Sequence, residues 1–116
     1  MNKQQVEDAV TRFSDLIDRS KDQQAYSDYK EGINEGLEIA KDTFDENAEK
    51  FVLSNSDYDR ATEIKSLQDR FDSLIDTLNI SKKPRYSQDN LDGIYRGLEI
   101  SKELFRDFIE EFCKSC

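Results

Sequence analysis

The two cysteines of the chain form its one conventional chemical motif. Cys113 and Cys116 are separated by two residues, the spacing of dithiol redox centres and of half a zinc site. A redox pair normally places its first cysteine at a helix N-terminus, where the dipole lowers the thiol pKa, but this pair follows the last apolar turn of a predicted helix. Two thiolates supply only two of four zinc ligands, so a dimer would be needed to complete a site. We therefore expect a frayed tail without chemical function, and we predict no metal and no cofactor.

Other chemistry is limited by the residue types that the sequence lacks. The 116 residues include no histidine, which removes the commonest general base, the Ser–His and Cys–His nucleophile pairs, and most zinc or di-iron sites on helices. All four glycines fall inside predicted helices, so no glycine loop is left to bind phosphate. We predict no catalytic residue and expect that the chain is not an enzyme.

The charge balance indicates what kind of partner to expect. Acidic residues outnumber basic ones by 26 to 17, which gives a formal net charge of −9. This balance argues against direct binding to nucleic-acid phosphates or to an anionic membrane, and it favours a basic protein surface as partner. The N-terminal region has no apolar segment typical of a signal peptide, and no apolar run approaches the roughly 18 residues of a membrane helix. We therefore expect a cytoplasmic location.

An internal repeat predicts the elements that carry these residues. The stretch GINEGLEIAK at residues 32–41 returns as GIYRGLEISK at residues 93–102, and RFSDLID at 12–18 returns as RFDSLID at 70–76. Within each half, apolar residues recur at spacings of three and four, which indicates α-helix. Helices are expected near residues 3–22, 28–53, 57–79 and 88–113.

A single helical hairpin cannot bury its own apolar face, whereas two stacked hairpins can. The sequence therefore predicts one all-α domain over residues 1–116. Its expected fold is a four-helix bundle with pseudo-twofold symmetry, built from two repeated hairpins at about 1–55 and 56–116.

The glycines of the repeated stretch predict a close helix crossing. Gly32 and Gly36 in the second helix, and Gly93 and Gly97 in the fourth, are each spaced by four residues. A glycine inside a helix costs about 1 kcal/mol relative to alanine, so we expect a packing reason for all four. We predict that the second and fourth helices cross at these glycines. The alternative is that the glycine faces receive the helix of a partner or of a second copy in a homodimer.

The second helix also carries acidic residues at spacings of three and four, on the side opposite its apolar residues. These candidate partner-binding residues are Glu31, Glu35, Glu38, Asp42, Asp45 and Glu49. In the fourth helix, Arg96 and Arg106 interrupt the corresponding series and are expected to pair with Asp92 and Glu110. Like charges at these spacings destabilise a helix by about 0.2–0.5 kcal/mol per pair, so the acidic series suggests a recognition surface. A solvated face without a binding role is the alternative.

Tyrosines near the expected helix starts have two interpretations. Tyr26, Tyr29 and Tyr95 could serve as interface anchors, since tyrosine is favoured in binding sites. They could instead close the ends of the core, which we expect for most of them. Tyr58 and Tyr86 have the same alternatives.

The segment Tyr29–Lys41, YKEGINEGLEIAK, resembles helices of small acidic accessory proteins of phages and mobile elements in Gram-positive bacteria. Some of these proteins are anti-defence proteins, including anti-CRISPR inhibitors. The resemblance covers about 13 residues of each repeat and implies a non-enzymatic protein that occupies a functional surface of a bacterial host protein. If that host protein binds nucleic acid, the acidic series could imitate a phosphate backbone. Alternative hypotheses are a bacteriocin-type immunity protein and a structural bundle that self-assembles through its glycine faces.

Overall fold

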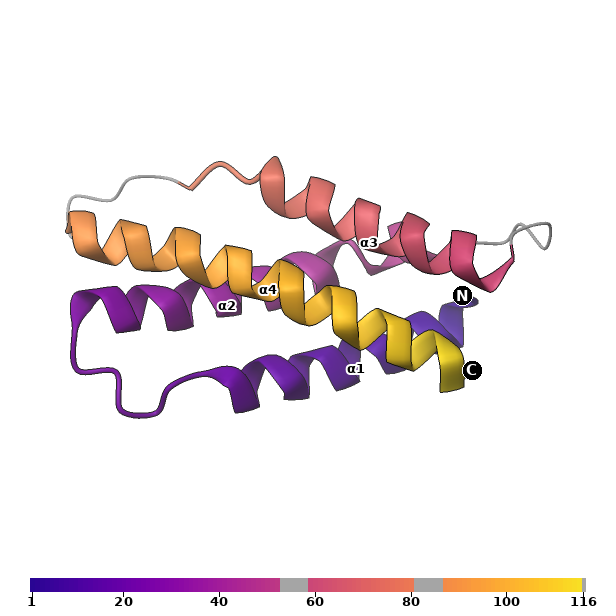
Figure 1. The fold of residues 1–116 in the computed structure, drawn as a ribbon, viewed down its shortest axis with the longest axis horizontal. Helices are drawn as coiled ribbons and strands as arrows, with labels where there is room; N and C mark the ends of the chain where they lie inside the picture. Colours follow the sequence, from indigo (N-terminus) through magenta and orange to yellow (C-terminus); the bar gives the residue numbers. More distant parts are fainter. Residues whose placement is uncertain (53–58, 81–86, 116) are drawn as a thin grey trace.

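The computed structural model of this chain describes residues 1–52, 59–80 and 87–115. Its helices are α1 (Lys3–Ser20), α2 (Asp28–Glu46), the short 3-10 helix η1 (Ala48–Phe51), α3 (Arg60–Asp76) and α4 (Gln88–Ser115). No strand occurs within the described ranges, and the predicted all-helical bundle is confirmed. The helices α2 and α4 lie at the centre, with α1 and α3 on opposite sides of them, in a bundle that extends 48 × 25 × 19 Å (Figure 1).

Polar side chains define where the helices begin. Asn2 and Gln5 form a capping box before α1, in which each side chain accepts a hydrogen bond from the other residue's backbone N–H, at 2.8 and 2.9 Å. Ser87 accepts a bond from the N–H of Asn90 at the start of α4 and also donates to the carboxylate of Asp28 at 2.9 Å. The side chain of Asn90 donates to the backbone oxygen of Asp28 at 3.0 Å. The N-termini of α2 and α4 are therefore held together.

The two central helices make their closest approach at the four glycines. A Cβ atom built on Gly32 would lie 2.9 Å from the Cα of Gly93, and one built on Gly36 would lie 3.0 Å from the Cα of Gly97. The contacts are reciprocal, and each such Cβ would also overlap with a backbone carbonyl oxygen of the other helix. Because residue 32 meets 93 and residue 36 meets 97, α2 and α4 run in the same direction. The glycine faces are thus filled within the chain itself.

Side chains along this contact become larger toward the C-terminal ends of both helices. Four residues beyond the second glycine stand Ala40 in α2 and Ser101 in α4, both fully buried, and four residues further stand Phe44 and Phe105. The centroids of these two rings are 5.2 Å apart. The distance between α2 and α4 therefore increases along the pair. Their backbones touch at the glycines, and two aromatic rings separate them at Phe44 and Phe105.

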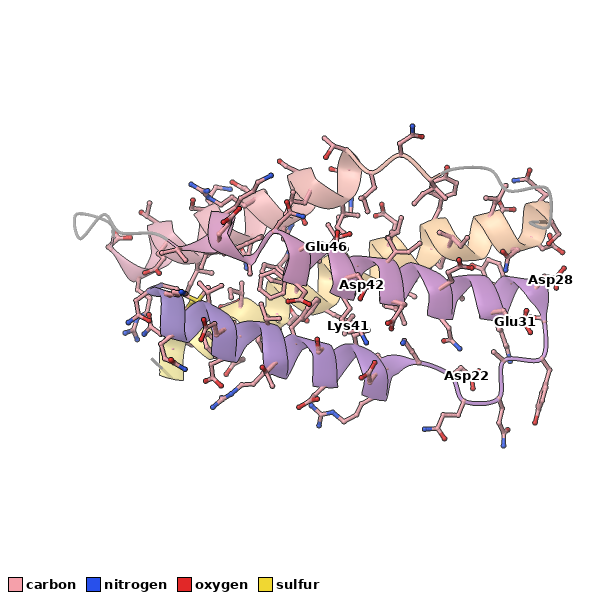
Figure 2. The ribbon with its side chains drawn as sticks, turned by 180° about the vertical axis from the view of Figure 1, so that it is seen from behind. Asp22, Asp28, Glu31, Lys41, Asp42 and Glu46 are labelled. Carbon is pink, nitrogen blue, oxygen red and sulfur yellow. The ribbon has the colours of Figure 1, made fainter. Side chains whose placement is uncertain are left out.

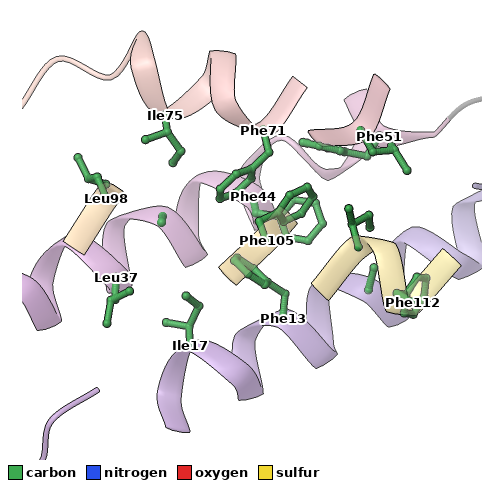
Figure 3. Close-up of a cluster of buried hydrophobic side chains, with 14 of the residues drawn as sticks. Phe13, Ile17, Leu37, Phe44, Phe51, Phe71, Ile75, Leu98, Phe105 and Phe112 are labelled. Atoms are coloured by element: carbon green, nitrogen blue, oxygen red, sulfur yellow. The ribbon is translucent and has the colours of Figure 1, made fainter. Parts of the chain in front are cut away.

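Phenylalanines from all four α-helices and η1 fill the widened space (Figure 3). The ring centroid of Phe13 in α1 lies 5.6 Å from that of Phe71 in α3 and 5.3 Å from that of Phe105, and both pairs are edge to face. Phe71 and Phe105 stack at 4.1 Å. Edge-to-face and offset stacked pairs are the preferred aromatic geometries. Each of these rings is at most 1% exposed, as are Phe44 and Phe51, so the outer helices α1 and α3 meet at this cluster.

The predicted second helix, residues 28–53, is wrong at its C-terminal end. The α-helix stops at Glu46 because Asn47 takes a non-helical conformation (φ −112°, ψ 18°), and its side-chain amide donates to the carbonyl of Thr43 at 2.8 Å. The chain continues as η1 and returns Phe51 to the core, where it packs 4.8 Å from Phe44.

The other predicted boundaries need smaller corrections. The third helix ends at Asp76 instead of residue 79, since the hydroxyl of Thr77 donates back to the carbonyl of Ser73 at 2.8 Å. It begins after Asp59, which caps it by accepting from the N–H of Thr62. The boundary expected between the two repeats, at residues 55 and 56, lies outside the described residues.

The prediction of a frayed tail is wrong for Cys113. The helix α4 continues to Ser115, and the Cys113 side chain is only 5% exposed. Ile109 and Phe112 extend the apolar face of α4 to this last turn, so the helix stays packed on the bundle where fraying was expected. Cys116 lies outside the described residues.

We expect Gly36→Ala to destabilise the protein. The new methyl group would overlap with the carbonyl oxygen of Ile94, a backbone atom that cannot rotate away. Overpacking typically costs about 1–3 kcal/mol, against a gain of about 1 kcal/mol in helix propensity. The free energy of unfolding, measured by urea denaturation with far-UV circular dichroism, should fall by up to about 2 kcal/mol. Glu103→Ala, an exposed change on α4, should shift it by less than about 0.5 kcal/mol. A stabilised Gly36→Ala protein would contradict the crossing.

Candidate functional site

Carboxylates with neither an ion pair nor a side-chain hydrogen bond to any described residue gather on the outer side of α2 and on η1. We call this set the α2 acidic face. It consists of Glu31, Asp42, Asp45, Glu46 and Glu49, all of them exposed. Figure 2 shows Glu31 near one end of α2 and Asp42 and Glu46 near the other, with Lys41 between α2 and α1. Four of the five carboxylates belong to residues 42–49, so the negative charge is concentrated at the C-terminal end of α2.

Glu38, in the middle of the predicted series, is part of the contact between α1 and α2. Its carboxylate pairs with Lys21 and with Lys41, the latter at 3.0 Å, and Lys41 also pairs with Asp18 of α1 at 3.2 Å. The hydrogen bond from Lys21, followed by that from Lys41, holds the pKa of Glu38 below its ordinary value. The hydrogen bond from Lys41 does the same for the pKa of Asp18. Glu38 is therefore neutralised by lysines and does not add to the α2 acidic face.

Glu35 also differs from the exposed members of the series. It is half-buried and takes part in an interaction within the chain. The six predicted binding residues thus separate into four exposed and unpaired carboxylates and two engaged ones. The engaged residues divide the series into Glu31 at the N-terminal end and a cluster at the C-terminal end.

Glu46 belongs to the α2 acidic face, but the sequence interpretation missed it. It follows Asp42 by four residues, a spacing that places both on one side of the helix. That spacing was available in the sequence. The predicted series continues from Asp42 through Asp45 to Glu49, a line of positions that does not include Glu46.

The corresponding surface of α4 keeps unpaired carboxylates at Glu103 and Asp107 but carries arginines at positions 96 and 106, and its ion pairs differ from the predicted ones. Arg106 does not pair with Glu110 but bridges to Asp72 of α3 at 2.8 Å, and Glu110 pairs instead with Lys114 at 3.3 Å. The carboxylate of Asp92 accepts a hydrogen bond from the side-chain amide of Gln88, not from Arg96. Spacing within one helix did not reveal these partners because the neighbouring helix offered Arg106 a closer carboxylate.

The ion-pair network of Lys41 has an equivalent in the second half of the chain. Lys102 pairs with Asp76 of α3 at 2.8 Å and with Glu99 at 3.1 Å. The hydrogen bond that Lys102 donates to Asp76, and then the one it donates to Glu99, raises the pKa of Lys102. Each lysine therefore joins an outer helix to a central helix at the same position of the repeat.

Three tyrosines lie on the surface instead of closing the core. Tyr26 in the connector before α2 is 87% exposed, Tyr29 in the first turn of α2 is 42% exposed, and Tyr95 on α4 is 53% exposed. The expectation that most tyrosines close the core ends is wrong for these three. Tyr29 and Tyr95 stand beside the glycine contact, where the backbones of α2 and α4 leave no space for a ring between them. Tyr58 and Tyr86 lie outside the described residues.

Within residues 1–52, 59–80 and 87–115, no group of three or more cysteine, aspartate or glutamate side chains could hold a metal ion. None of the helices in these ranges is long and apolar enough to cross a membrane. What the described surface offers for recognition is charge and exposed aromatic rings.

Comparison with known proteins finds no family model, no curated protein and no solved structure that matches this chain. Its function is therefore inferred from its own surface.

The Lys41 network predicts a specific pH dependence. Because the folded-state pKa values of Asp18 and Glu38 are depressed, their ion pairs contribute stability above the ordinary values of 3.8 and 4.5 and lose it as the pH falls through the folded values. In Lys41→Met, the pKa of Asp18 should rise toward 3.8 in an NMR titration of the side-chain carboxyls. Stability should then decline less steeply in acid. Lys102→Met is the matched control and should leave Asp18 unchanged. An Asp18 titration that Lys41→Met does not move would contradict the network.

Proposed function

We propose that this protein is a non-enzymatic binding module that inhibits or regulates a bacterial host protein by occupying a basic region of its surface. The observation that carries the proposal is the α2 acidic face. Its carboxylates have no ion-pair partner in the described part of the chain, whereas the equivalent surface of α4 is interrupted by arginines. In this proposal the protein acts in the cytoplasm, as an anti-defence protein would.

The unfavourable free energy of like charges close together on α2 supports a binding role for the α2 acidic face. Asp42 and Glu46 are four residues apart on one helix, a like-charge arrangement that destabilises by about 0.2–0.5 kcal/mol. The equivalent pair on α4, Glu103 and Asp107, has the same spacing but is accompanied by Arg106, where α2 has a further acid, Asp45. No described lysine or arginine offsets the repulsion on α2, although Lys41 stands directly beside Asp42 in sequence. The ammonium of Lys41 instead forms ion pairs with Asp18 and Glu38. A cationic partner would relieve the repulsion on binding, and complementary charge would also speed the encounter.

The distribution of charge favours a compact basic patch on the partner. The cluster from Asp42 to Glu49 covers eight residues, whose seven steps would rise by roughly 10 Å if the segment were an α-helix throughout. Imitation of a phosphate backbone is the narrower form of the proposal, in which the host protein normally binds nucleic acid. The lysines around Glu38 interrupt the row of negative charge along α2. This interruption favours a compact basic patch on the partner over imitation of a phosphate backbone.

Exposed tyrosines supply a second kind of contact near the other end of α2. Tyr26 and Tyr29 lie close in sequence to Glu31. Tyrosine gives a rigid apolar ring with a polar end, and it is enriched among residues that dominate binding energy. A partner that reaches both ends of α2 would combine apolar burial with charge pairing.

The two halves of the chain are, in this proposal, copies of one hairpin related by a pseudo-twofold axis, of which the first has specialised for binding. The equivalent lysine networks and the reciprocal glycine contacts support this view. Self-assembly through the glycine faces would require α2 and α4 to separate first, because each glycine face is occupied by the other.

The test compares two double charge reversals at equivalent positions of the repeat. Asp42→Lys with Glu46→Lys alters the α2 acidic face, and Glu103→Lys with Asp107→Lys makes the same change in net charge on α4. All four side chains are exposed and have no ion pair within the described ranges. A bacterial protein captured by the wild type should be identified, purified and measured again by calorimetry. The α2 variant should weaken binding by about tenfold or more, and the α4 variant by less than about twofold.

Added salt should weaken the wild-type complex, because exposed charge pairs are screened. Equal binding by both variants would place the interface elsewhere. Equal loss in both would mean that only net charge matters, and either result would reject the α2 acidic face as the site. Circular dichroism of each variant checks that the fold is retained.

A further inference from the structure

The outward side of α3 has an unusual charge for so acidic a chain. The carboxylates of α3 that face neighbouring elements are engaged: Glu63 pairs with the N-terminal amine, Asp72 with Arg106, and Asp76 with Lys102. Asp69 remains on the outside, where it pairs with Lys65 at 3.7 Å. Arg70 therefore adds an uncompensated positive charge to this side.

An open groove of about 620 Å³ runs along this side of α3 and is bordered by η1. Its volume lies within the range of small-molecule sites, and the groove is open to solvent. The residues that line it are cations and hydroxyl-bearing side chains, with one carboxylate and one leucine. They are Lys50, Thr62, Lys65, Ser66, Asp69, Arg70, Ser73, Leu74 and Thr77.

Arg70 is held at the edge of the groove by η1. Its guanidinium donates one hydrogen bond, at 2.7 Å, to the backbone oxygen of Lys50. Arg70 and Lys50 both line the groove, one from α3 and the other from η1. Neither side chain has a carboxylate partner among the described residues, and two like charges placed together without a counterion repel each other. The remaining guanidinium N–H groups of Arg70 are available to a ligand.

Two serines complete a set of donors around Arg70. Ser66 precedes it by four residues and Ser73 follows it by three, so all three lie on one side of α3. Within the described ranges, the hydroxyls of Ser66 and Ser73 make no hydrogen bond. The hydroxyl of Thr77, in contrast, is used by backbone carbonyls of α3. The groove thus presents a guanidinium, an ammonium and two hydroxyls as unused donors.

We propose that this groove binds a small phosphate-bearing anion. A tetrahedral oxyanion has several acceptor oxygens pointing in different directions, which suits donors that come from two elements. Arginine binds such groups with two parallel hydrogen bonds, while lysine adds a point charge. The site shares no residue with the α2 acidic face, so it can be tested independently of the proposed partner binding.

The experiment is an NMR titration of ¹⁵N-labelled protein with inorganic pyrophosphate at constant ionic strength, and in parallel with ADP. Two or three charge-assisted hydrogen bonds predict saturable shifts at Lys50, Ser66, Arg70 and Ser73 with a Kd of about 1 mM or tighter. Similar affinity for both probes would mean that the diphosphate is what binds. Tighter binding of ADP would mean that the nucleoside adds contacts in the groove, and both outcomes support the site.

Arg70→Gln should weaken binding by about tenfold or more. Lys50→Gln should also weaken it, and this variant keeps the hydrogen bond from Arg70 to the backbone, so its effect does not depend on a structural change at η1. Arg96→Gln is the control, because it removes one exposed positive charge from α4 and should change the Kd by less than about twofold. Non-saturable shifts, the same shifts with sodium chloride, or equal losses in all three variants would overturn the proposal.

Discussion

Gly32 and Gly36 of α2 lie against Gly93 and Gly97 of α4 so closely that the backbone of one helix occupies the space of a side chain on the other. Four residues further along, the contact accommodates Ala40 and Ser101, and then Phe44 and Phe105. This increase in side-chain size makes the helices diverge from a touching N-terminal end. The outer helices can reach the core only where the pair has opened, which is where Phe13 and Phe71 meet the central rings.

The same arrangement explains why so much charge remains on the surface. A small bundle with a core of this kind has only one apolar side per helix, and every other side meets solvent or the edge of a neighbour. At those edges, lysines such as Lys41 and Lys102 bridge carboxylates from two helices. Carboxylates beyond the reach of such a bridge stay unpaired, and on α2 they accumulate in one place.

Features that depend on spacing within a helix could be predicted from the sequence. The repeat, the helical class and the glycine stretches follow from local periodicity, and much of the buried side of each helix does as well. Features decided by a neighbouring element could not. Asn47 ends α2 so that Phe51 can enter the core, and Arg106 selects Asp72 of α3 over a residue in its own helix. Glu38 shows the same limit, because only the packing of α1 brings Lys21 to it.

The two halves of the chain differ in which carboxylates their basic side chains neutralise. In the second half, Lys102 and Arg106 form ion pairs with carboxylates of α3. As a result, α3 presents Arg70 to solvent without a nearby unpaired acid. In the first half, the position equivalent to Arg106 is Asp45, and no cation on α2 replaces it. A substitution at one position of the repeat therefore affects two surfaces, since an arginine there pairs with the outer helix and an aspartate remains in solvent. The first half of the chain thus carries an acidic side on α2, and the second half carries a cationic groove on α3.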